Sequence, residues 1–144
     1  MKKQTKKGFT LVELVIVIAV IAILSAILIP TFGNVISQAK ENAAQEDART
    51  AYQQFLMDNS ENDIVTSENY TAYILVDATV SNSSSISNAT YVYSFADGAL
   101  KKVEFSEVAG AETGAAITVN TTLTAGEAFA LSKTGMYIVF KTNG

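Results

Sequence analysis

The sequence contains no cysteine and no histidine. Without cysteine there is no disulfide, and without either residue the usual zinc ligands are missing. Histidine is also the side chain that enzymes use most often as a general base, and no other catalytic constellation takes its place along the chain. We therefore expect a protein that is not an enzyme, with no catalytic residue, no metal site and no cofactor.

Proline is nearly absent as well, with Pro30 as its one occurrence, and charge is scarce at 17% of residues. Four of the ten basic residues (Lys2, Lys3, Lys6 and Lys7) precede position 8, where there is no acidic residue. Removal of residues 1–8 leaves six basic side chains against fourteen acidic ones, a net side-chain charge of −8. Phosphate contacts need a basic surface, so the composition predicts no direct nucleic-acid binding.

One long apolar run dominates the N-terminal part of the chain. It spans 21 residues from Phe9 to Ile29, and Glu13 is its single ionisable side chain. As a helix it is roughly 30 Å long, the thickness of the hydrocarbon core of a bilayer. The lysines before it stay on the cytoplasmic side, which predicts a single-pass membrane helix. An ordinary secretory signal is the alternative, but the run is long for one and Leu24-Ser25-Ala26 is a poor cleavage site.

Glu13 is costly in such a place. A carboxylate within hydrocarbon costs about 2.5–3.5 kcal/mol, less near the interface, and no lysine, arginine or histidine lies within helical reach inside the run. Cleavage after Gly8 creates an α-amino group on Phe9, four residues from Glu13, and this amine can pair with Glu13 of its own chain or of a neighbour. The alternative is a carboxylate that reaches the lipid head-groups.

The segment Gly8-Phe9-Thr10-Leu11-Val12-Glu13-Leu14 resembles the prepilin signature of type IV pilins and type II secretion pseudopilins. The resemblance implies that a prepilin peptidase cleaves between Gly8 and Phe9 and N-methylates Phe9. It also implies that Glu13 neutralises the terminus of a neighbouring subunit, and that Pro30 is the helix-kinking proline of the family. Gly8 and Phe9 are thus the predicted processing residues, and Phe9, Glu13 and Pro30 the predicted assembly residues.

Two features depart from the family pattern. Many pilins have a glycine in mid-span where this chain has Ala22, so local melting of the helix on assembly is less assured. Many pilins of double-membrane bacteria close a C-terminal loop with a disulfide, which a chain without cysteine cannot form. The second departure favours a single-membrane cell or a pseudopilin-like subunit.

Helical periodicity resumes after Pro30 and predicts a helix to about Met57, ended by the turn-forming residues 58–63. Its apolar residues form two stripes that lie roughly 140° apart around the helix. The first stripe is Phe32, Val35, Ile36, Ala39 and Ala43, and the second is Ala44, Ala48, Ala51, Tyr52 and Phe55. We expect the first stripe to pack on neighbouring helices of a filament and the second on the chain's own sheet; the alternative is a generally alanine-rich helix with noisy patterning.

Strand-like periodicity follows from residue 70. The predicted strands, which hold most of the tyrosines, are Tyr70–Val76, Thr90–Phe95, Leu100–Ser106, Ile117–Thr121, Glu127–Ser132 and Met136–Lys141. The predicted fold is α+β, a long helix packed on a C-terminal antiparallel β-sheet. The predicted domains are a basic leader (1–8), a transmembrane or filament-core helix (9–30), an amphipathic second half of that helix (31–59) and a sheet head domain (60–144).

Two loops and one hairpin complete the prediction. Ser81–Asn88 and residues 107–116 are predicted as loops. Asp97-Gly98 is a strong hairpin signal, but its register stays open. A strict two-residue loop pairs Phe95 with Leu100 and Val92 with Val103, whereas one bulged residue gathers the aromatic and apolar side chains on a single face.

The remaining polar motifs have ordinary explanations. Glu104, Glu107 and Glu112 offer the oxygen ligands that calcium needs, as in the major pseudopilins that the chain resembles, but they lack a compact ligand loop and read as solvated surface carboxylates. Three tripeptides that begin at Asn82, Asn88 and Asn120 fit the glycosylation sequon, and in a chain so rich in Ser, Thr and Asn they are expected by chance.

Together the resemblance implies a structural subunit of a type IV pilus-like filament. Its partners are further copies of itself in a helical homo-polymer, the prepilin peptidase, the pilus assembly platform, and membrane lipid before assembly. The implied location is the cytoplasmic membrane first and an extracellular filament at the cell surface afterwards. The alternatives are a major pseudopilin of a secretion or DNA-uptake machine and, from another class, a membrane-anchored or secreted monomeric binding module.

Overall fold

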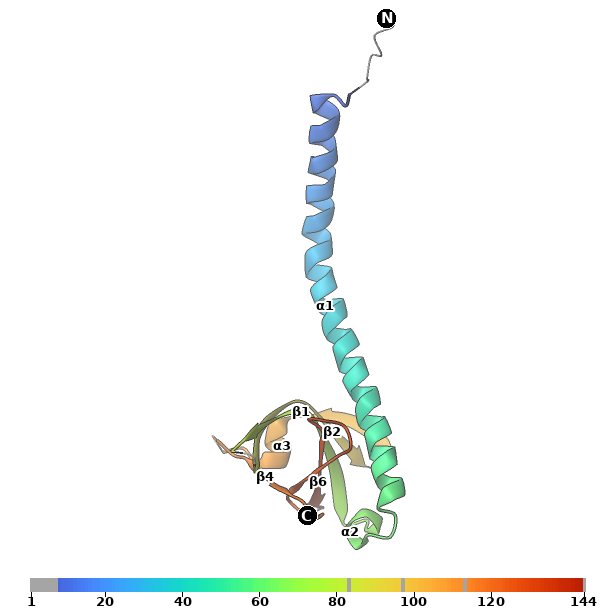
Figure 1. The fold of residues 1–144 in the computed structure, drawn as a ribbon, viewed down its shortest axis with the longest axis vertical. Helices are drawn as coiled ribbons and strands as arrows, with labels where there is room; N and C mark the ends of the chain where they lie inside the picture. Colours follow the sequence, from blue (N-terminus) through green and yellow to red (C-terminus); the bar gives the residue numbers. More distant parts are fainter. Residues whose placement is uncertain (1–7, 83, 97, 113, 144) are drawn as a thin grey trace, which may run out of the picture. The chain divides into compact units, whose positions relative to one another are not determined.

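The structure is a computed structural model that describes residues 8–82, 84–96, 98–112 and 114–143 (Figure 1). Helix α1 (Leu11–Asp58) is the longest element, and the chain divides into two compact units after Lys40. We call residues 41–143 the head. The head holds the second part of α1 and then α2 (Asp63–Thr66), β1 (Tyr70–Ser81), β2 (Ser85–Ala96), β3 (Ala99–Val103), α3 (Phe105–Ala109), β4 (Ile117–Asn120), β5 (Ala128–Ala130) and β6 (Tyr137–Thr142).

Helix α1 continues through Pro30 and ends at Asp58, close to the predicted Met57. At this end the carbonyl of Phe55 accepts hydrogen bonds from both the backbone N–H and the Nδ2 of Asn59, each at 3.0 Å. The chain then turns into α2, where the side chain of Asn62 accepts a hydrogen bond from the N–H of Ile64 at 2.9 Å and caps the short helix.

The six strands form one sheet in the order β1-β6-β5-β4-β2-β3, and β1 also pairs with β2. Five strands therefore close on themselves, and β3 extends the sheet beyond β2. The predicted α+β class is confirmed, with one difference: β4 and β5 pair in parallel, through Val119 and Ala128. Both strands are short, so the seven residues 121–127 are enough to bring the chain back to the same end of the sheet. This connection contains a turn in which the N–H of Glu127 donates to the carbonyl of Thr124.

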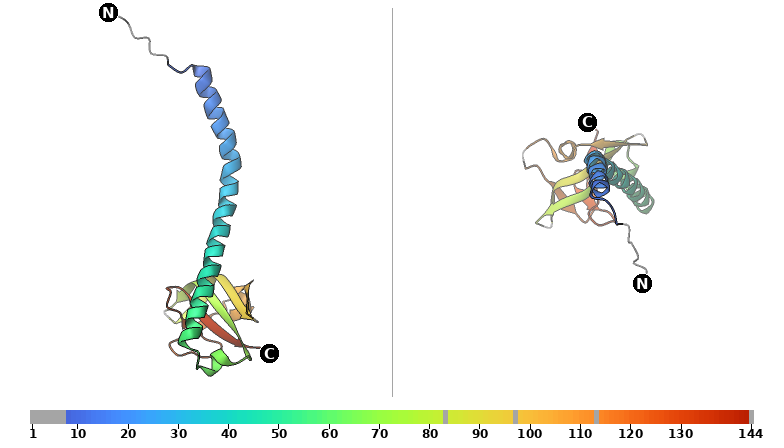
Figure 2. Two further views of the ribbon diagram at one scale, coloured as in Figure 1. Left: turned by 90° about the vertical axis from the view of Figure 1, so that its right-hand side faces the viewer. Right: turned by 90° about the horizontal axis from the view of Figure 1, so that it is seen from above.

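The outer face of the sheet packs against α1, as the left view of Figure 2 shows for the head. Ala44, Ala48 and Phe55 are the buried helix residues, while Ala51 and Tyr52 are partly buried beside them. These five are the second predicted stripe, so its packing on the chain's own sheet is confirmed. In the first stripe Phe32, Val35 and Ile36 are 58%, 55% and 51% exposed, and their packing on neighbouring helices stays a prediction.

A second core lies on the other face of the sheet, where the closed strands surround apolar side chains of their own. Val108 of α3 is buried there among residues of β1, β2, β4, β5 and β6. The buried members are Leu75, Ile86, Ala89, Val92, Val108, Ile117, Ala128 and Val139. Both faces of the sheet are therefore apolar, and the five tyrosines predicted in strands do lie in strands.

The hairpin between β2 and β3 has the strict register, since Phe95 pairs with Leu100 and Val92 with Val103. Asp97 of the predicted turn lies outside the described residues, and Gly98 has a φ of +73°. The hairpin between β5 and β6 is also present, with Ala130 opposite Tyr137.

Two loop predictions are wrong in part. Residues 85–88 belong to β2 and pair with the end of β1, because Ile86 is fully buried between exposed or half-buried polar neighbours. Residues 105–109 form α3. This helix replaces the end of the strand predicted over Leu100–Ser106 and the start of the loop predicted over 107–116. The burial of Val108 explains why this segment leaves the sheet and turns back over it.

Candidate functional site

Helix α1 begins with a reciprocal pair of hydrogen bonds between Thr10 and Glu13. The backbone N–H of Thr10 donates to Glu13 Oε2 at 3.2 Å, and the N–H of Glu13 donates to Thr10 Oγ1, also at 3.2 Å. This is a capping box, in which the N-cap and N3 side chains each satisfy one backbone donor that the helix leaves unpaired. The carboxylate also lies in the first turn, where the positive end of the helix dipole favours it.

Phe9 stands immediately before this cap. Its side chain is 94% exposed, and it borders a shallow apolar depression together with Glu13, Leu14 and Val17. Phe9 and Leu14 occupy the N′ and N4 positions, which form a hydrophobic staple in many helices. The N-terminal aromatic residue thus lies on the same side of the helix start as the acidic residue, with its ring open to contact from outside.

Gly8 has no structural reason to be glycine. A Cβ built on it meets no atom within 4 Å, and its φ does not fall in the left-handed region that favours glycine. Replacement by a larger residue therefore costs the described fold little. A glycine that the fold does not need is one that an outside factor, such as a processing enzyme, can require.

The residues that follow are apolar and exposed. In the described chain, α1 alone is long and apolar enough to cross a membrane, with a mean hydropathy of 3.1 over its most apolar 18 residues. Leu11, Ile16 and Ile27 are 77%, 56% and 63% exposed. Pro30 has no N–H to donate to the carbonyl of Ala26, four residues before it. The next residue, Thr31, donates through Oγ1 to the carbonyl of Ile27 at 3.0 Å.

The cap adds a partner of Glu13 that the prediction missed. Sequence reasoning sought a cation within helical reach and overlooked the backbone, although Thr10 and Glu13 have the Thr-x-x-Glu spacing of a capping box. In the parts of the chain that the structure describes there are two ion pairs, and neither includes Glu13. The role of Glu13 toward a second chain remains a prediction, as do the roles of Gly8, Phe9 and Pro30.

The other polar candidates lie in the head and do not form a site. Glu104, Glu107 and Glu112 are all exposed, and within the described residues no three acidic side chains gather as metal ligands would. Of the sequon asparagines, Asn120 donates through Nδ2 to Glu127 Oε2 at 2.6 Å. Asn82 and Asn88 are exposed, and Ser83 of the first sequon lies outside the described residues.

Comparison with known proteins finds relatives of this N-terminal segment. Residues 3–29 match the family described as the prokaryotic N-terminal methylation motif. A type IV major fimbrial protein, FimA of Dichelobacter nodosus, is 42% identical to this chain over 62 residues. The N-terminal region is thus similar to that of type IV pilins. The fimbrial protein EcpC of Eikenella corrodens is also similar, with 48% identity over 44 residues.

The similarity to these pilins is confined to part of each chain. The FimA match covers 41% of this chain and 40% of the relative, and the EcpC match covers 31% and 29%. The chain thus matches about two fifths or less of the length of these relatives. No solved structure matches the chain significantly. The similarity to pilins therefore rests on the N-terminal motif, and the head is described from its own structure.

Proposed function

We propose that this protein is the structural subunit of a type IV pilus-like filament, made as a membrane-anchored precursor and assembled through its N-terminal helix. Hydrolysis of the peptide bond between Gly8 and Phe9 releases the leader with a terminal Gly8 carboxylate and leaves a free α-amine on Phe9. The prepilin peptidase that cleaves this bond also methylates the new amine. The apolar surface of residues 9–29 then exchanges lipid for the helices of neighbouring subunits.

The observation that carries the proposal is the placement of Glu13. It is the single ionisable residue in an exposed apolar run of 21 residues, in a segment that matches the methylation motif. Its Oε2 atom accepts the N–H of Thr10, and a carboxylate accepts several hydrogen bonds. The cap therefore holds the acidic group at the helix start and leaves acceptor capacity for the Phe9 amine of another subunit.

The electrostatic contribution of this pair is large enough to set the axial register of the subunits. Removal of one partner of a buried ion pair costs about 3–5 kcal/mol, because the other charge is left without compensation. At about 1.4 kcal/mol per tenfold change, that is a roughly 100- to 4,000-fold weaker subunit association. Subunits that lack the acidic group are thus expected to fail in assembly even though their apolar surface is intact.

Two substitutions of Glu13 separate its local role from its assembly role. Glu13→Ala removes both the cap and the charge, whereas Glu13→Gln keeps an oxygen that accepts the N–H of Thr10 and removes the charge. We expect both variants to insert in the membrane and to be cleaved, and both to be absent from sheared surface filaments. Normal filaments from Glu13→Gln would contradict the register role, and normal filaments from both would remove any role of Glu13 in assembly.

Processing is tested independently at Gly8. The fold tolerates a side chain there, so a Gly8→Val subunit that fails to mature fails for a reason other than misfolding. We expect the uncleaved precursor to accumulate in the membrane. Mass spectrometry that finds a methylated Phe9 terminus in this variant would refute the cleavage-site assignment.

Electron microscopy of sheared surface material, with mass spectrometry of the subunit N-terminus, tests the proposal as a whole. Long filaments that contain a subunit beginning at methylated Phe9, and that disappear when the gene is deleted, are the expected result. A native protein that still carries Met1, or one found only as a monomer in its host, would overturn the proposal.

A further inference from the structure

The C-terminal end of the docked part of α1 is held to the sheet by aromatic side chains. Tyr52 stacks on Phe95 with ring centroids 4.0 Å apart, and Phe55 lies 6.0 Å from Phe129 and 5.9 Å from Phe140 by the same measure. Phe55 is only 4% exposed. We call these five residues the aromatic anchor, and they combine large apolar burial with favourable ring geometry.

The preceding turns of the docked helix have no comparable side chain. Their buried residues are Ala44 and Ala48, each of which contributes a single methyl group to the interface. Because hydrophobic stabilisation grows with the apolar area removed from water, this stretch is held far more weakly than the anchor by apolar contacts.

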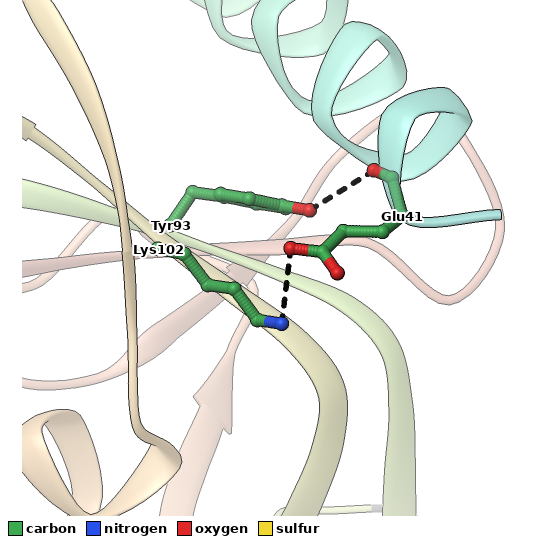
Figure 3. A network of polar contacts seen from close by, with 3 residues as sticks. All are labelled: Glu41, Tyr93 and Lys102. Carbon is green, nitrogen blue, oxygen red and sulfur yellow. Dashed lines mark hydrogen bonds and ion pairs between the residues drawn. The ribbon is translucent and has the colours of Figure 1, made fainter. Parts of the chain in front are cut away.

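Polar contacts hold the start of the docked helix instead (Figure 3). Tyr93 Oη donates to the backbone carbonyl of Glu41 at 3.3 Å, and Lys102 Nζ lies 3.0 Å from Glu41 Oε1. Tyr93 and Lys102 are opposite each other on β2 and β3, so one cross-strand pair of the hairpin contacts Glu41 of the helix. Burial first, and then the charges of Glu41 and Tyr91, raise the pKa of Tyr93 to about 12, so its hydroxyl remains a donor at neutral pH.

A second ion pair joins the same stretch to the turn between β5 and β6. Lys133 Nζ lies 2.5 Å from Asp47 Oδ2, and both side chains are about half exposed. The side chains of Lys102 and Glu41 are 52% and 42% exposed. Ion pairs this open to water contribute little and exchange readily with solvent. Apart from the hydrogen bond of Tyr93, only the two small buried side chains of Ala44 and Ala48 therefore oppose release of residues 41–48 from the sheet.

We infer that Glu41, Tyr93 and Lys102 form a latch, which opens to release the first turns of the docked helix while the aromatic anchor stays closed. With the latch closed, α1 is attached to the sheet from Glu41 onward. With the latch open, attachment begins at Tyr52, and the unattached helix is longer by eleven residues, or roughly 16 Å. If the subunit is a filament component, as proposed above, this gives the head a flexible attachment, and the released turns, no longer packed on the sheet, open their helical hydrogen bonds more often.

Hydrogen exchange of the full chain in detergent micelles tests the latch and does not depend on filament formation. We expect the amides of residues 45–51 to exchange roughly tenfold faster than those of residues 55–58, because local opening precedes release of the anchor. Tyr93→Phe should accelerate exchange of residues 45–51 by about 2- to 12-fold, the change expected for one hydrogen bond. Lys102→Met should accelerate it by about 1.4- to 5-fold, the change expected for an exposed ion pair. Both should leave residues 55–58 unchanged.

Lys101→Met is the matched control. Lys101 precedes Lys102 on β3 and faces the other side of the sheet, so the same change of charge and volume should not affect residues 45–51. Equal protection along residues 45–58, or equal effects of the two lysine substitutions, would overturn the latch. If Lys102→Met accelerates exchange throughout the head, the result for Tyr93→Phe decides whether the latch exists. Faster exchange confined to residues 45–51 in Tyr93→Phe supports the latch, and uniformly faster or unchanged exchange contradicts it.

Discussion

Replacement of Phe55 by alanine tests how far one side chain holds the head together. Phe55 is 4% exposed and its ring contacts the rings of Phe129 and Phe140, so alanine leaves a cavity in the core between α1 and the sheet. A buried Phe→Ala substitution costs about 3–5 kcal/mol. A domain of this size has a total stability of about 5–15 kcal/mol, so the expected loss is at least about a fifth of the whole.

The head has its own spectroscopic probe for this measurement. All six tyrosines lie between residues 52 and 137, and the chain has no tryptophan, so tyrosine fluorescence reports on the head alone. Each kcal/mol lowers the melting temperature of a domain of about 100 residues by roughly 4–8 °C. We therefore expect Phe55→Ala to lower the melting temperature of the full chain in detergent by at least about 12 °C.

Met57→Ala is the control for helix content at nearly the same position. Met57 is 74% exposed, and surface substitutions usually change stability by less than about 0.5 kcal/mol. The two substitutions should thus differ in melting temperature by roughly 10 °C or more. Equal effects, or a loss below about 1 kcal/mol for Phe55→Ala, would refute the argument that this residue anchors the helix to the sheet.

Three further predictions concern single features of the head. The pKa of Tyr93 is raised to about 12 from an ordinary 10.0, so the folded state keeps a proton that the unfolded state loses; this stabilisation is complete below about pH 10 and is lost as the pH rises to about 12. Denaturant titration should show a smaller loss in Tyr93→Phe than in the native chain, because Tyr52, whose pKa burial also raises, still contributes in the variant. Asn143→Ala removes the side-chain hydrogen bonds to the Glu68 carbonyl and from the Thr71 hydroxyl, and urea unfolding should show a loss of about 1–3 kcal/mol. Gly98→Ala places a Cβ at a φ of +73°, and the same assay should show a cost of about 1–2 kcal/mol.

The sequence predicted the long helix and its docking face well, because the information is local. The second stripe repeats with helical spacing, and its small alanines followed by Tyr52 and Phe55 mark a surface that fits closely on a sheet. The hairpin around Gly98 was also readable, since a turn signal between two β-rich segments limits the pairing to two registers. Choosing between those registers needed information that the sequence does not contain, namely that both faces of the sheet are covered.

That second covered face explains most of what the sequence did not reveal. Tyr93 faces the helix while Val92 faces the closed interior, so the strand is apolar on both sides and loses its alternation. The closure depends on pairing between β1 and β6 and between β2 and β4, which lie far apart in the sequence, and periodicity does not report which distant strands pair. Helix α3 is only five residues long and has too few turns to show a period of its own.

The capping box changes how Glu13 is understood, because it shows that a local role and an intermolecular role are compatible. If the carboxylate served its own helix alone, its charge would gain only the helix-dipole term of about 0.3–1 kcal/mol, which is less than the cost of about 2.5–3.5 kcal/mol for a charge in hydrocarbon. If it served a neighbour alone, its reciprocal hydrogen bonds with Thr10 would have no explanation. A carboxylate has acceptor sites for both, and the cap fixes it where the helix begins, one turn from the terminus that the proposed processing creates. Glu13→Gln is therefore the more discriminating substitution, since it keeps the cap and removes the charge that the proposed contact with a second subunit uses.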